Sequence, residues 1–364
     1  MAERSNIEWC DSTFNPWVGC TKISPACDHC YAEALMDTRM GRAKWGAGQP
    51  RARTSTANWQ NPLRWDRADF RCCDVCGWRG EIDARRSIVC PACMHDDSLE
   101  PARRRVFCAS LADVFDNEVP IEWLVDLVDL IRRTPNIDWL LLTKRIGNVL
   151  PRLHGAVGAL DRGYRSGEAT GDLCDWIDYW TGGGAVPRNV WLGATICNQA
   201  EADRDIPKLL ATPAEKRFLS IEPMLGPIDL TSVRRFSGMC EYIDALRGSC
   251  WTDQAGLINP DPAWSKPGML FSDGARGIDW IIAGGESGPH ARPSHPAWFR
   301  SLRDQCAAAD VPFLFKQWGD WVSVSEAEGA GPHRKFPGGA TVRRVGKKTA
   351  GRLLDGRTQD GFPA

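Results

Sequence analysis

Residues 278–286 read IDWIIAGGE, a run in which apolar side chains are nearly continuous. Such a run does not alternate with polar residues, which is typical of a strand buried on both faces of a parallel sheet. The same pattern recurs, each time ending at a small or polar residue, at 105–110 (RVFCAS), 138–143 (DWLLLT), 189–195 (NVWLGAT), 216–222 (KRFLSIE) and 312–317 (PFLFKQ). We expect an earlier strand at 15–19.

Amphipathic helices are predicted between these strands. Residues 121–133 place apolar side chains at helical spacing, after Pro120 and before Pro135. Helices are also expected at 31–40 and at 297–309, the latter with Ser294 as a possible cap. Alternating strands and helices predict an α/β fold with a parallel sheet. Periodicity leaves open whether that sheet is a partial or full (β/α) barrel or a doubly wound sheet.

Three stretches interrupt the alternation and are interpreted as loop insertions: 71–101, 154–187 and 231–277. We therefore expect a barrel-like α/β domain at 1–319 with an inserted subdomain at 71–101. Residues 320–364 are rich in Gly, Lys and Arg, and we expect a partly irregular C-terminal tail there.

Charge and hydropathy exclude several classes of protein. The 364 residues include 45 Lys and Arg and 46 Asp and Glu, giving a net charge of −1. This balance excludes a strongly basic nucleic-acid coat protein but not a local basic patch. No apolar run approaches the roughly 18 residues that span a bilayer. The first residues lack the apolar core of a signal peptide, so we expect a cytoplasmic protein with no membrane partner.

Cysteine usage points to metal. The chain has 15 cysteines, and their odd number argues against a complete disulfide framework. Clustered thiols in a reducing compartment are typical of metal ligands.

The first cluster is Cys20, Cys27 and Cys30, spaced C-x6-C-x2-C. Three thiolates leave a four-ligand centre one ligand short. Tetrahedral zinc would need a fourth ligand, such as His29 or Cys10. A [4Fe–4S] cluster would instead keep one iron open to a substrate or cofactor. Free buried thiols are the third interpretation.

The second cluster reads C-x2-C-x13-C-x2-C and consists of Cys73, Cys76, Cys90 and Cys93. Two such knuckles predict a zinc ribbon, with Cys72 as a possible substitute for Cys73. A 31-residue insert buries little core, so the metal would supply its folding energy.

Arginines surround the ribbon and give it a second possible role. They are Arg79, Arg85, Arg86, Arg103, Arg104 and Arg105. Together with Trp78 they could grip nucleic acid. A purely structural staple and a protein contact are the alternatives.

Seven segments in order resemble a widespread phage and prophage family, described as the three-Cys-motif family and similar to radical S-adenosylmethionine (SAM) enzymes. They are NPWVGCTKISPACDHCYAE, VFCASLADVFDNEVP, LLLTKR, WLGATICNQ, FLSIEPMLGPIDL, IDWIIAGGESGPHARP and PFLFKQWG. The resemblance spans about residues 7–319. It implies a radical SAM-type barrel and a [4Fe–4S] cluster held by Cys20, Cys27 and Cys30.

The resemblance also implies that strand ends face S-adenosylmethionine, because function gathers at the carboxyl ends of barrel strands. The expected cofactor-binding residues are Ser110, Asp113, Thr195, Glu222, Gly284, Gly285 and Glu286. Acidic residues at strand ends also cap helices, which is the alternative role for Glu222 and Glu286. The first cysteine gap is longer than the usual C-x3-C-x2-C, and the Gly-Gly-Glu triplet lies late in the chain.

These observations predict a radical SAM enzyme, an isomerase or lyase supplied by a reducing electron donor. Because the resembled family is phage-borne, we expect a phage enzyme that rearranges an amino-acid-modified thymidine in DNA, a hypermodification that evades restriction. A lesion-reversing enzyme like the spore photoproduct lyases is one alternative. A non-catalytic, zinc-stapled nucleic-acid-binding protein is another. The phosphate-loop, dinucleotide-binding and serine-hydrolase motifs do not occur in the sequence.

Overall fold

The computed structural model describes residues 3–82, 89–235, 241–251 and 276–363. The chain divides into two compact units. The first comprises Met1–Thr21, Ala32–Leu192 and Pro213–Glu215. The second comprises Lys22–Tyr31, Gly193–Thr212 and Lys216–Ala364.

Seven strands form the main sheet, in the order β1-β7-β8-β9-β10-β14-β15. They are β1 (Ser12–Phe14), β7 (Arg104–Cys108), β8 (Ile137–Thr143), β9 (Val190–Thr195), β10 (Lys216–Ile221), β14 (Trp280–Gly284) and β15 (Phe313–Gln317). In the first unit β1, β7 and β8 run parallel, and in the second unit β10, β14 and β15 do. The predicted α/β fold with a parallel sheet is confirmed, and the strand order is compatible with a partial β/α barrel.

The first strand differs from its prediction. Strand β1 ends at Phe14, and the expected strand at 15–19 contributes only β2 (Trp17–Val18), which pairs antiparallel with β3 (Ala52–Arg53). Pro16 separates the two because proline has no N–H to donate to a sheet.

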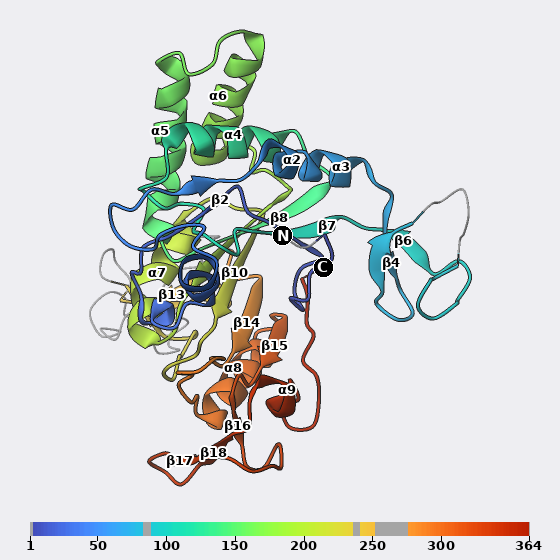
Figure 1. Cartoon of the computed structure of the whole chain (residues 1–364), viewed down its shortest axis with the longest axis vertical. Coiled ribbons are helices and arrows are strands. Elements are labelled where there is room, and N and C mark those ends of the chain that lie inside the picture. Colours follow the sequence, from blue (N-terminus) through green and yellow to red (C-terminus); the bar gives the residue numbers. More distant parts are fainter. Residues whose placement is uncertain (1–2, 83–88, 236–240, 252–275, 364) are drawn as a thin grey trace, which may run out of the picture. The chain divides into compact units, whose positions relative to one another are not determined.

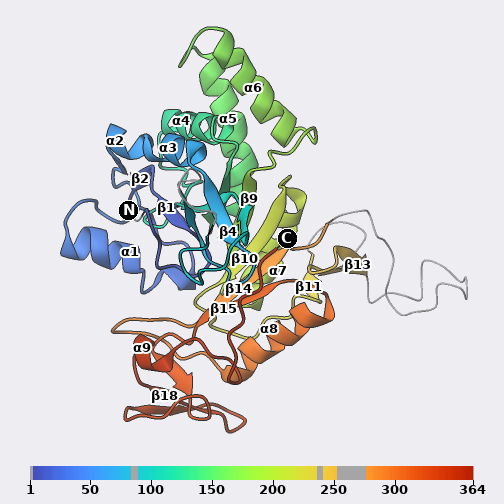
Figure 2. The ribbon, with the colours of Figure 1, turned by 90° about the vertical axis from the view of Figure 1, so that its right-hand side faces the viewer.

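Helices α4 (Ile121–Arg132), α5 (Val149–Asp161) and α6 (Glu168–Thr181) lie side by side in the first unit (Figure 2). The prediction of helix 121–133 is confirmed, and the loop insertion expected at 154–187 is wrong. Leu173, Ile177 and Trp180 form a buried stripe at helical spacing along α6. The glycine cluster that suggested a loop begins only at Gly182, where α6 ends.

Shorter elements complete the first unit. Helices α2 (Thr56–Trp59) and α3 (Asn61–Arg67) precede the predicted insertion. The insertion itself contains a three-stranded antiparallel sheet, in the order β5-β4-β6. Its strands are β4 (Phe70–Cys73), β5 (Arg79–Glu81) and β6 (Leu99–Pro101).

Residues 24–39, which include Cys27 and Cys30 of the first cysteine motif, are largely helical. A 3-10 turn, η1 (Pro25–Cys27), is capped by Ser24, whose hydroxyl accepts from the Ala26 N–H at 3.1 Å. It is followed by α1 (Tyr31–Glu33) and by a π-helical stretch, η2 (Ala34–Arg39).

The second unit contains α7 (Gln199–Ala211) and α8 (Pro296–Ala308). Helix α8 was predicted at nearly these bounds, but its expected cap is wrong. His295 is the N-cap and accepts from the Ala297 N–H at 3.1 Å, while the Ser294 hydroxyl donates to the Met224 carbonyl at 2.6 Å. Burial of Ser294 against that carbonyl removes its hydroxyl from the helix end.

Two small antiparallel sheets also belong to the second unit. Part of the insertion expected at 231–277 forms β11 (Val233–Arg234), β12 (Tyr242–Asp244) and β13 (Ser249–Trp251), while residues 236–240 and 252–275 lie outside the described residues. The expected irregular tail instead forms β16 (Trp321–Ser323), β17 (His333–Lys335), β18 (Thr341–Arg344) and helix α9 (Lys347–Ala350) (Figure 1). Val322 and Val342 are fully buried, so this segment is packed against neighbouring residues and is not an irregular tail.

Among the described residues, every helix is too short or too polar to cross a membrane.

Candidate metal centres and strand-end site

The predicted second cysteine cluster comes together in the first unit. Cys73 closes β4, and its carbonyl accepts from the Gly77 N–H at 2.9 Å; Gly77 has a φ of 72°. Cys90 repeats this turn, because its carbonyl accepts from the Met94 N–H at 2.9 Å. Each C-x2-C pair is thereby folded into a tight knuckle that directs two thiols to one point.

The four thiols of Cys73, Cys76, Cys90 and Cys93 all lie within 4.8 Å of one another. Sγ of Cys73 is 3.6 Å from that of Cys93, and Sγ of Cys76 is 3.7 Å from that of Cys90. A tetrahedron with metal–sulfur bonds of about 2.3 Å has edges of about 3.8 Å. The spacing therefore fits four thiolates around a single metal ion, and this group could bind a metal.

A second hydrogen-bonded shell supports these thiols. The Ser98 hydroxyl, 3.4 Å from Cys73 Sγ, lowers the pKa of that thiol to about 6. Ser98 Oγ also lies 3.1 Å from the His95 carbonyl oxygen, an alternative acceptor for the one proton of this hydroxyl. Cys72 is not part of the group of four thiols, so the alternative in which it replaces Cys73 is wrong. Adjacent residues of a strand point to opposite faces, which separates Cys72 from Cys73.

The arginines expected to grip nucleic acid are engaged inside the first unit. Arg79 Nε lies 3.0 Å from Asp11, and Arg103 Nε lies 3.0 Å from Asp138. Arg104 is buried and pairs with Glu81. Burial also lowers the pKa of Arg105 to about 10. Arg85 and Arg86 lie outside the described residues, and nucleic-acid contact at this ribbon stays a prediction.

Cys20 of the first cluster lies beside a buried arginine of the first unit. Nη1 of Arg145 is 3.5 Å from Cys20 Sγ, and Nη2 donates to the Thr21 carbonyl at 2.9 Å. The Arg145 side chain is 6% exposed. Burial raises the pKa of Cys20 to about 12, opposed in part by Arg145. Arg145 thus places a buried positive charge against a thiol that is only partly exposed.

Two carboxylates hold Arg145 in place. Asp113 lies 3.6 Å from Nη1, and Asp116 lies 3.8 Å from Nε. Asp116 also pairs at 2.8 Å with Arg51, whose side chain is fully buried. The result is a buried network of alternating charges at the carboxyl ends of β7 and β8.

Two predicted cofactor-binding residues are already engaged at these strand ends. Asp113 accepts from the Thr143 hydroxyl at 2.6 Å and from the Lys144 N–H at 2.9 Å. Ser110 accepts from the Asn15 side-chain amide at 3.0 Å. Both residues join neighbouring strand ends, and a role toward S-adenosylmethionine stays a prediction for them.

Cys27 and Cys30 belong to the second unit, where they lie one turn of chain apart. The Cys30 N–H donates to the Cys27 carbonyl at 3.2 Å. Cys20 belongs to the first unit, so this motif is divided between the two units.

A network of ion pairs fixes the Cys27–Cys30 loop to the end of β14. Glu286 receives hydrogen bonds from Arg292 Nη2 at 2.6 Å and Nε at 2.9 Å. His29 Nδ1 lies 3.1 Å from the same carboxylate. Arg292 also donates to Asp28 at 2.8 Å and to the Pro25 carbonyl at 2.9 Å. One guanidinium therefore ties the cysteine loop to the strand end, and we call Glu286, Arg292, His29 and Asp28 the loop clamp.

Electrostatics within the loop clamp are strong. Burial alone would raise the pKa of Glu286, but hydrogen bonds from Arg292 and His29 hold it below its ordinary value. Both carboxylate oxygens of Glu286 already accept hydrogen bonds from the loop clamp, so the role that the structure gives Glu286 is to hold the cysteine loop. Its predicted contact with S-adenosylmethionine stays a prediction.

Glu222 directly follows β10 and is paired with residues of β15. Lys316 Nζ lies 2.8 Å from one carboxylate oxygen, and the Gln317 side-chain amide donates to the other at 3.0 Å. Gln317 also donates to the Ser287 hydroxyl at 3.2 Å. The carboxyl ends of these two strands are thereby joined through polar side chains.

Two buried polar atoms at these strand ends have no partner among the described residues: Thr195 Oγ1 and Gln317 Oε1. Thr195 is 3% exposed and Gln317 6%. Buried polar atoms nearly always have a hydrogen-bond partner, because an unmade bond costs about 1–3 kcal/mol. Both atoms thus indicate a place where a polar ligand or a water molecule binds.

The two predicted glycines differ in their surroundings. A Cβ on Gly284 would lie 3.3 Å from Glu222 Oε1, so the glycine leaves space beside that carboxylate. A Cβ on Gly285 would lie 1.9 Å from the Trp318 carbonyl oxygen, and the Gly285 N–H donates to the Gln317 carbonyl at 3.0 Å. Close backbone packing therefore accounts for Gly285.

Sequence reasoning missed Arg145 as a neighbour of Cys20 and Arg292 as the centre of the loop clamp. Arg145 follows a predicted strand in the LLLTKR segment, which was the available signal. Arg292 follows the Gly-Gly-Glu triplet by six residues, but nothing in that spacing indicates a partner near residue 28.

Fold and site together define an α/β protein with a parallel sheet and a four-thiol group suited to one metal ion. The chain belongs to a family of proteins of unknown function, DUF5131, whose family model matches residues 4–363. No curated protein and no solved structure matches the chain.

Proposed function

We propose that this protein is a radical S-adenosylmethionine enzyme with a [4Fe–4S] cluster on Cys20, Cys27 and Cys30. The carrying observation is the loop clamp, which fixes Cys27 and Cys30 at the carboxyl end of β14. Functional sites of parallel α/β sheets lie at this edge. The sequence adds a third thiol and a spacing that leaves one iron without a protein ligand.

The available donors fit these two cofactors. All three cysteines are free thiols. Thr195 Oγ1 and Gln317 Oε1 are buried atoms able to bind polar groups of a small molecule. Glu222 lies beside Gln317, and although Lys316 and Gln317 each bind one of its carboxylate oxygens, each oxygen keeps a further lone pair for an amine or a ribose hydroxyl.

When bound, the two cofactors supply one-electron cleavage of a sulfonium, which permits hydrogen-atom abstraction from an unactivated carbon. This chain's residues orient and insulate that chemistry. Arg145 offsets the negative charge of Cys20 and donates toward its sulfur. Arg292 and Glu286 hold the loop that bears Cys27 and Cys30.

For the four-thiol group we propose zinc with a structural role. Sulfur spacings of 3.6 and 3.7 Å favour a single tetrahedral ion over an iron–sulfur cube, which spaces its thiolates farther apart. The three short strands around this group bury little surface, so the ion would supply much of the subdomain's folding energy.

As substrate class we propose a modified base in DNA, rearranged in an isomerase reaction at a carbon that is not acidic. The resemblance to a phage-borne family supports this choice. Repair of a thymine lesion, as in spore photoproduct lyases, is the second candidate and would use the same cofactors.

The test begins with metal content and cofactor cleavage. Anaerobically reconstituted protein should contain about four iron, four sulfide and one zinc per chain. With a one-electron reductant it should convert S-adenosylmethionine to methionine and 5′-deoxyadenosine. Cys27→Ala should lose the iron and the cleavage but keep the zinc.

Cys174→Ala is the matched control, because Cys174 is a partly exposed free thiol on α6, away from both cysteine motifs in sequence. It should keep both metals. Zinc without iron after reconstitution would refute the radical mechanism and favour a zinc-stapled binding protein. Cleavage that is stimulated by a peptide or free metabolite, but not by enzymatically modified or ultraviolet-damaged DNA, would refute the DNA substrate.

A further inference from the structure

Positive charge is concentrated near the end of the chain. Residues 329–354 contain no Asp or Glu, although the whole chain carries 45 basic and 46 acidic residues. The basic residues of this segment are Arg334, Lys335, Arg343, Arg344, Lys347, Lys348 and Arg352. Such a concentration in a nearly neutral protein indicates a specific polyanion surface.

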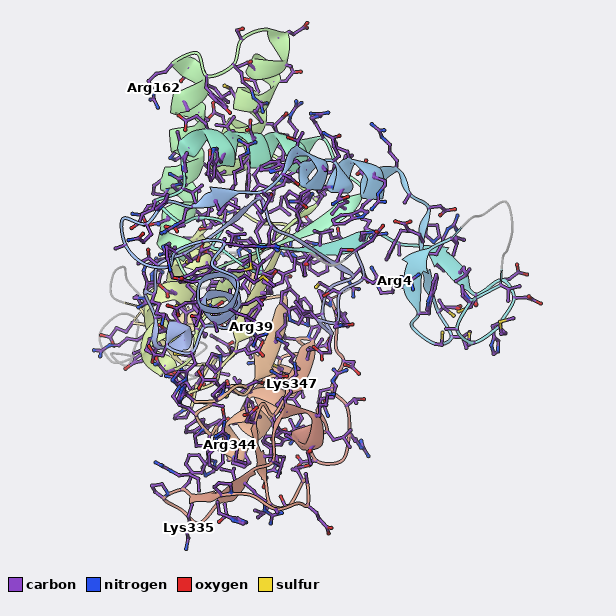
Figure 3. All side chains as sticks on the ribbon, in the orientation of Figure 1. Arg4, Arg39, Arg162, Lys335, Arg344 and Lys347 are labelled. Carbon is purple, nitrogen blue, oxygen red and sulfur yellow. The ribbon has the colours of Figure 1, made fainter. Side chains whose placement is uncertain are left out.

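The fold presents part of this charge on one strand pair. Strand β17 pairs with β18 in an antiparallel register that places His333 opposite Arg343 and Lys335 opposite Thr341. Because side chains alternate across a strand and directly opposite residues share a face, His333, Lys335 and Arg343 lie on one face. Figure 3 shows Lys335 extending outward at the end of β17.

Four of these cations are exposed: Arg334, Lys335, Lys347 and Lys348. No carboxylate of the described residues forms an ion pair with them. Arg344 is different, because it donates to the Gly288 carbonyl at 2.8 Å and pairs with Asp320 at 3.2 Å. Arg344 therefore anchors β18, while the four exposed cations keep their charge available.

Aromatic side chains near the start of α8 pack against the end of β17. The Phe336 ring, directly after β17, lies 4.9 Å from the His295 ring and 6.0 Å from the Trp298 ring. The Phe336 N–H donates to the Ala340 carbonyl at 2.8 Å across the turn. The strand pair is thus held against the start of α8, which reduces the entropy lost when its cations bind a ligand.

We propose that the β17–β18 hairpin and α9, named here the basic hairpin surface, dock duplex DNA through its phosphates. The proposal deepens and rests on the DNA substrate of the proposed function. A two-stranded ribbon fits a DNA groove, and phosphate contacts made by Lys and Arg position a protein without reading sequence. Residues 333–348 contain no exposed large apolar side chain of the kind that inserts into a lipid surface.

The arginines near the four-thiol group differ from the exposed cations of the basic hairpin surface, because they are paired with carboxylates. Arg79, Arg103 and Arg104 pair with Asp11, Asp138 and Glu81. Their positive charge is already offset, whereas that of the four exposed cations Arg334, Lys335, Lys347 and Lys348 is not. We therefore assign phosphate docking to the C-terminal sheet.

The test measures binding of a fluorescent 20-base-pair duplex by anisotropy, with the metal-loaded full chain and without S-adenosylmethionine. Each phosphate contact contributes about 0.9 to the slope of log K against log salt. Arg334 and Lys335 lie on opposite faces of β17, so a docked duplex contacts one of them, and the double variant R334Q/K335Q should lower that slope by about 0.9 and weaken binding at low salt several-fold. K347Q/K348Q should lower the slope by a similar amount.

R162Q/R188Q is the matched control, because it removes two exposed arginines from the first unit (Figure 3 labels Arg162). It should leave the slope unchanged. Equal slopes for R334Q/K335Q and the wild-type protein would overturn the proposal, as would binding to vesicles containing phosphatidylserine but not to the duplex. Cofactor cleavage plays no part in this assay, so loss of cleavage with intact salt-dependent DNA binding would refute the radical mechanism alone.

Discussion

Arg292→Met is the most informative single change, because it removes the guanidinium at the centre of the loop clamp and keeps an unbranched apolar side chain in place of the arginine stem. The guanidinium makes four hydrogen bonds: two to Glu286, one to Asp28 and one to the Pro25 carbonyl. After substitution, the Glu286 carboxylate would remain buried with only His29 and the residue 292 N–H as partners.

The expected cost follows from the exposure of each partner. Removing one member of a fully buried pair costs about 3–5 kcal/mol. Arg292 is 29% exposed and the Glu286 side chain 6%, so water recovers part of that cost. Asp28 is 54% exposed, and its pair contributes about 0–1 kcal/mol. In total, we expect Arg292→Met to destabilise the closed conformation of the cysteine loop by about 2–3 kcal/mol.

This loss should appear as local opening of the cysteine loop. The Cys27 N–H donates to the Ser24 carbonyl at 2.8 Å and the Cys30 N–H to the Cys27 carbonyl at 3.2 Å, so both amides report on the loop. A decrease of about 2–3 kcal/mol in the free energy of local opening makes amide hydrogen exchange in this loop roughly 30- to 150-fold faster. Hydrogen-exchange mass spectrometry of peptides covering 22–31, in protein purified without iron, measures it directly.

Arg303→Met is the control, because Arg303 also pairs with two carboxylates in the second unit. Those partners, Asp304 and Asp355, are 67% and 40% exposed, so the control should cost less than about 1 kcal/mol. Unchanged exchange in Arg292→Met, or equal acceleration in both variants, would refute the assignment of Arg292 as the residue that holds the cysteine loop.

Three further predictions concern the other charged and thiol groups. Glu286→Gln should lower the free energy of unfolding by about 1–3 kcal/mol at pH 7, measured by urea unfolding. This difference from wild type should shrink below pH 4.5, because a carboxylate whose pKa is lowered by folding stabilises the folded state only at pH values above its unfolded pKa. A difference independent of pH would contradict this. Cys90→Ser should release about one zinc per chain and make residues 71–101 sensitive to protease while the iron content stays unchanged; retained zinc would contradict a four-thiol site. Arg145→Met should shift the midpoint potential of the proposed cluster to a more negative value, as measured by redox-poised spectroscopy, because a positive charge beside Cys20 favours the reduced form; an unchanged potential would show that Arg145 acts only in packing.

Local patterns predicted much of the fold and failed at identifiable places. The apolar runs located six strands of the main sheet to within a few residues, because strands buried on both faces must be apolar along their length. The glycines at 182–184 concealed α6, whose buried stripe ends just before them. Ser294 is a good helix cap by residue type, but its hydroxyl binds the Met224 carbonyl, a partner 70 residues away.

What the sequence determined by itself is local chemistry: the strand-forming runs, the two C-x2-C knuckles and the charge concentrated after residue 329. Knuckle geometry depends on turns of a few residues, so spacing suffices to predict it. Only the tertiary structure decided the partners of buried charges, because Arg292 and Asp28 are 264 residues apart and Arg145 and Cys20 are 125 apart. An arginine can pair with any carboxylate or thiolate that the fold brings within reach, and chain separation carries no information about which one that is.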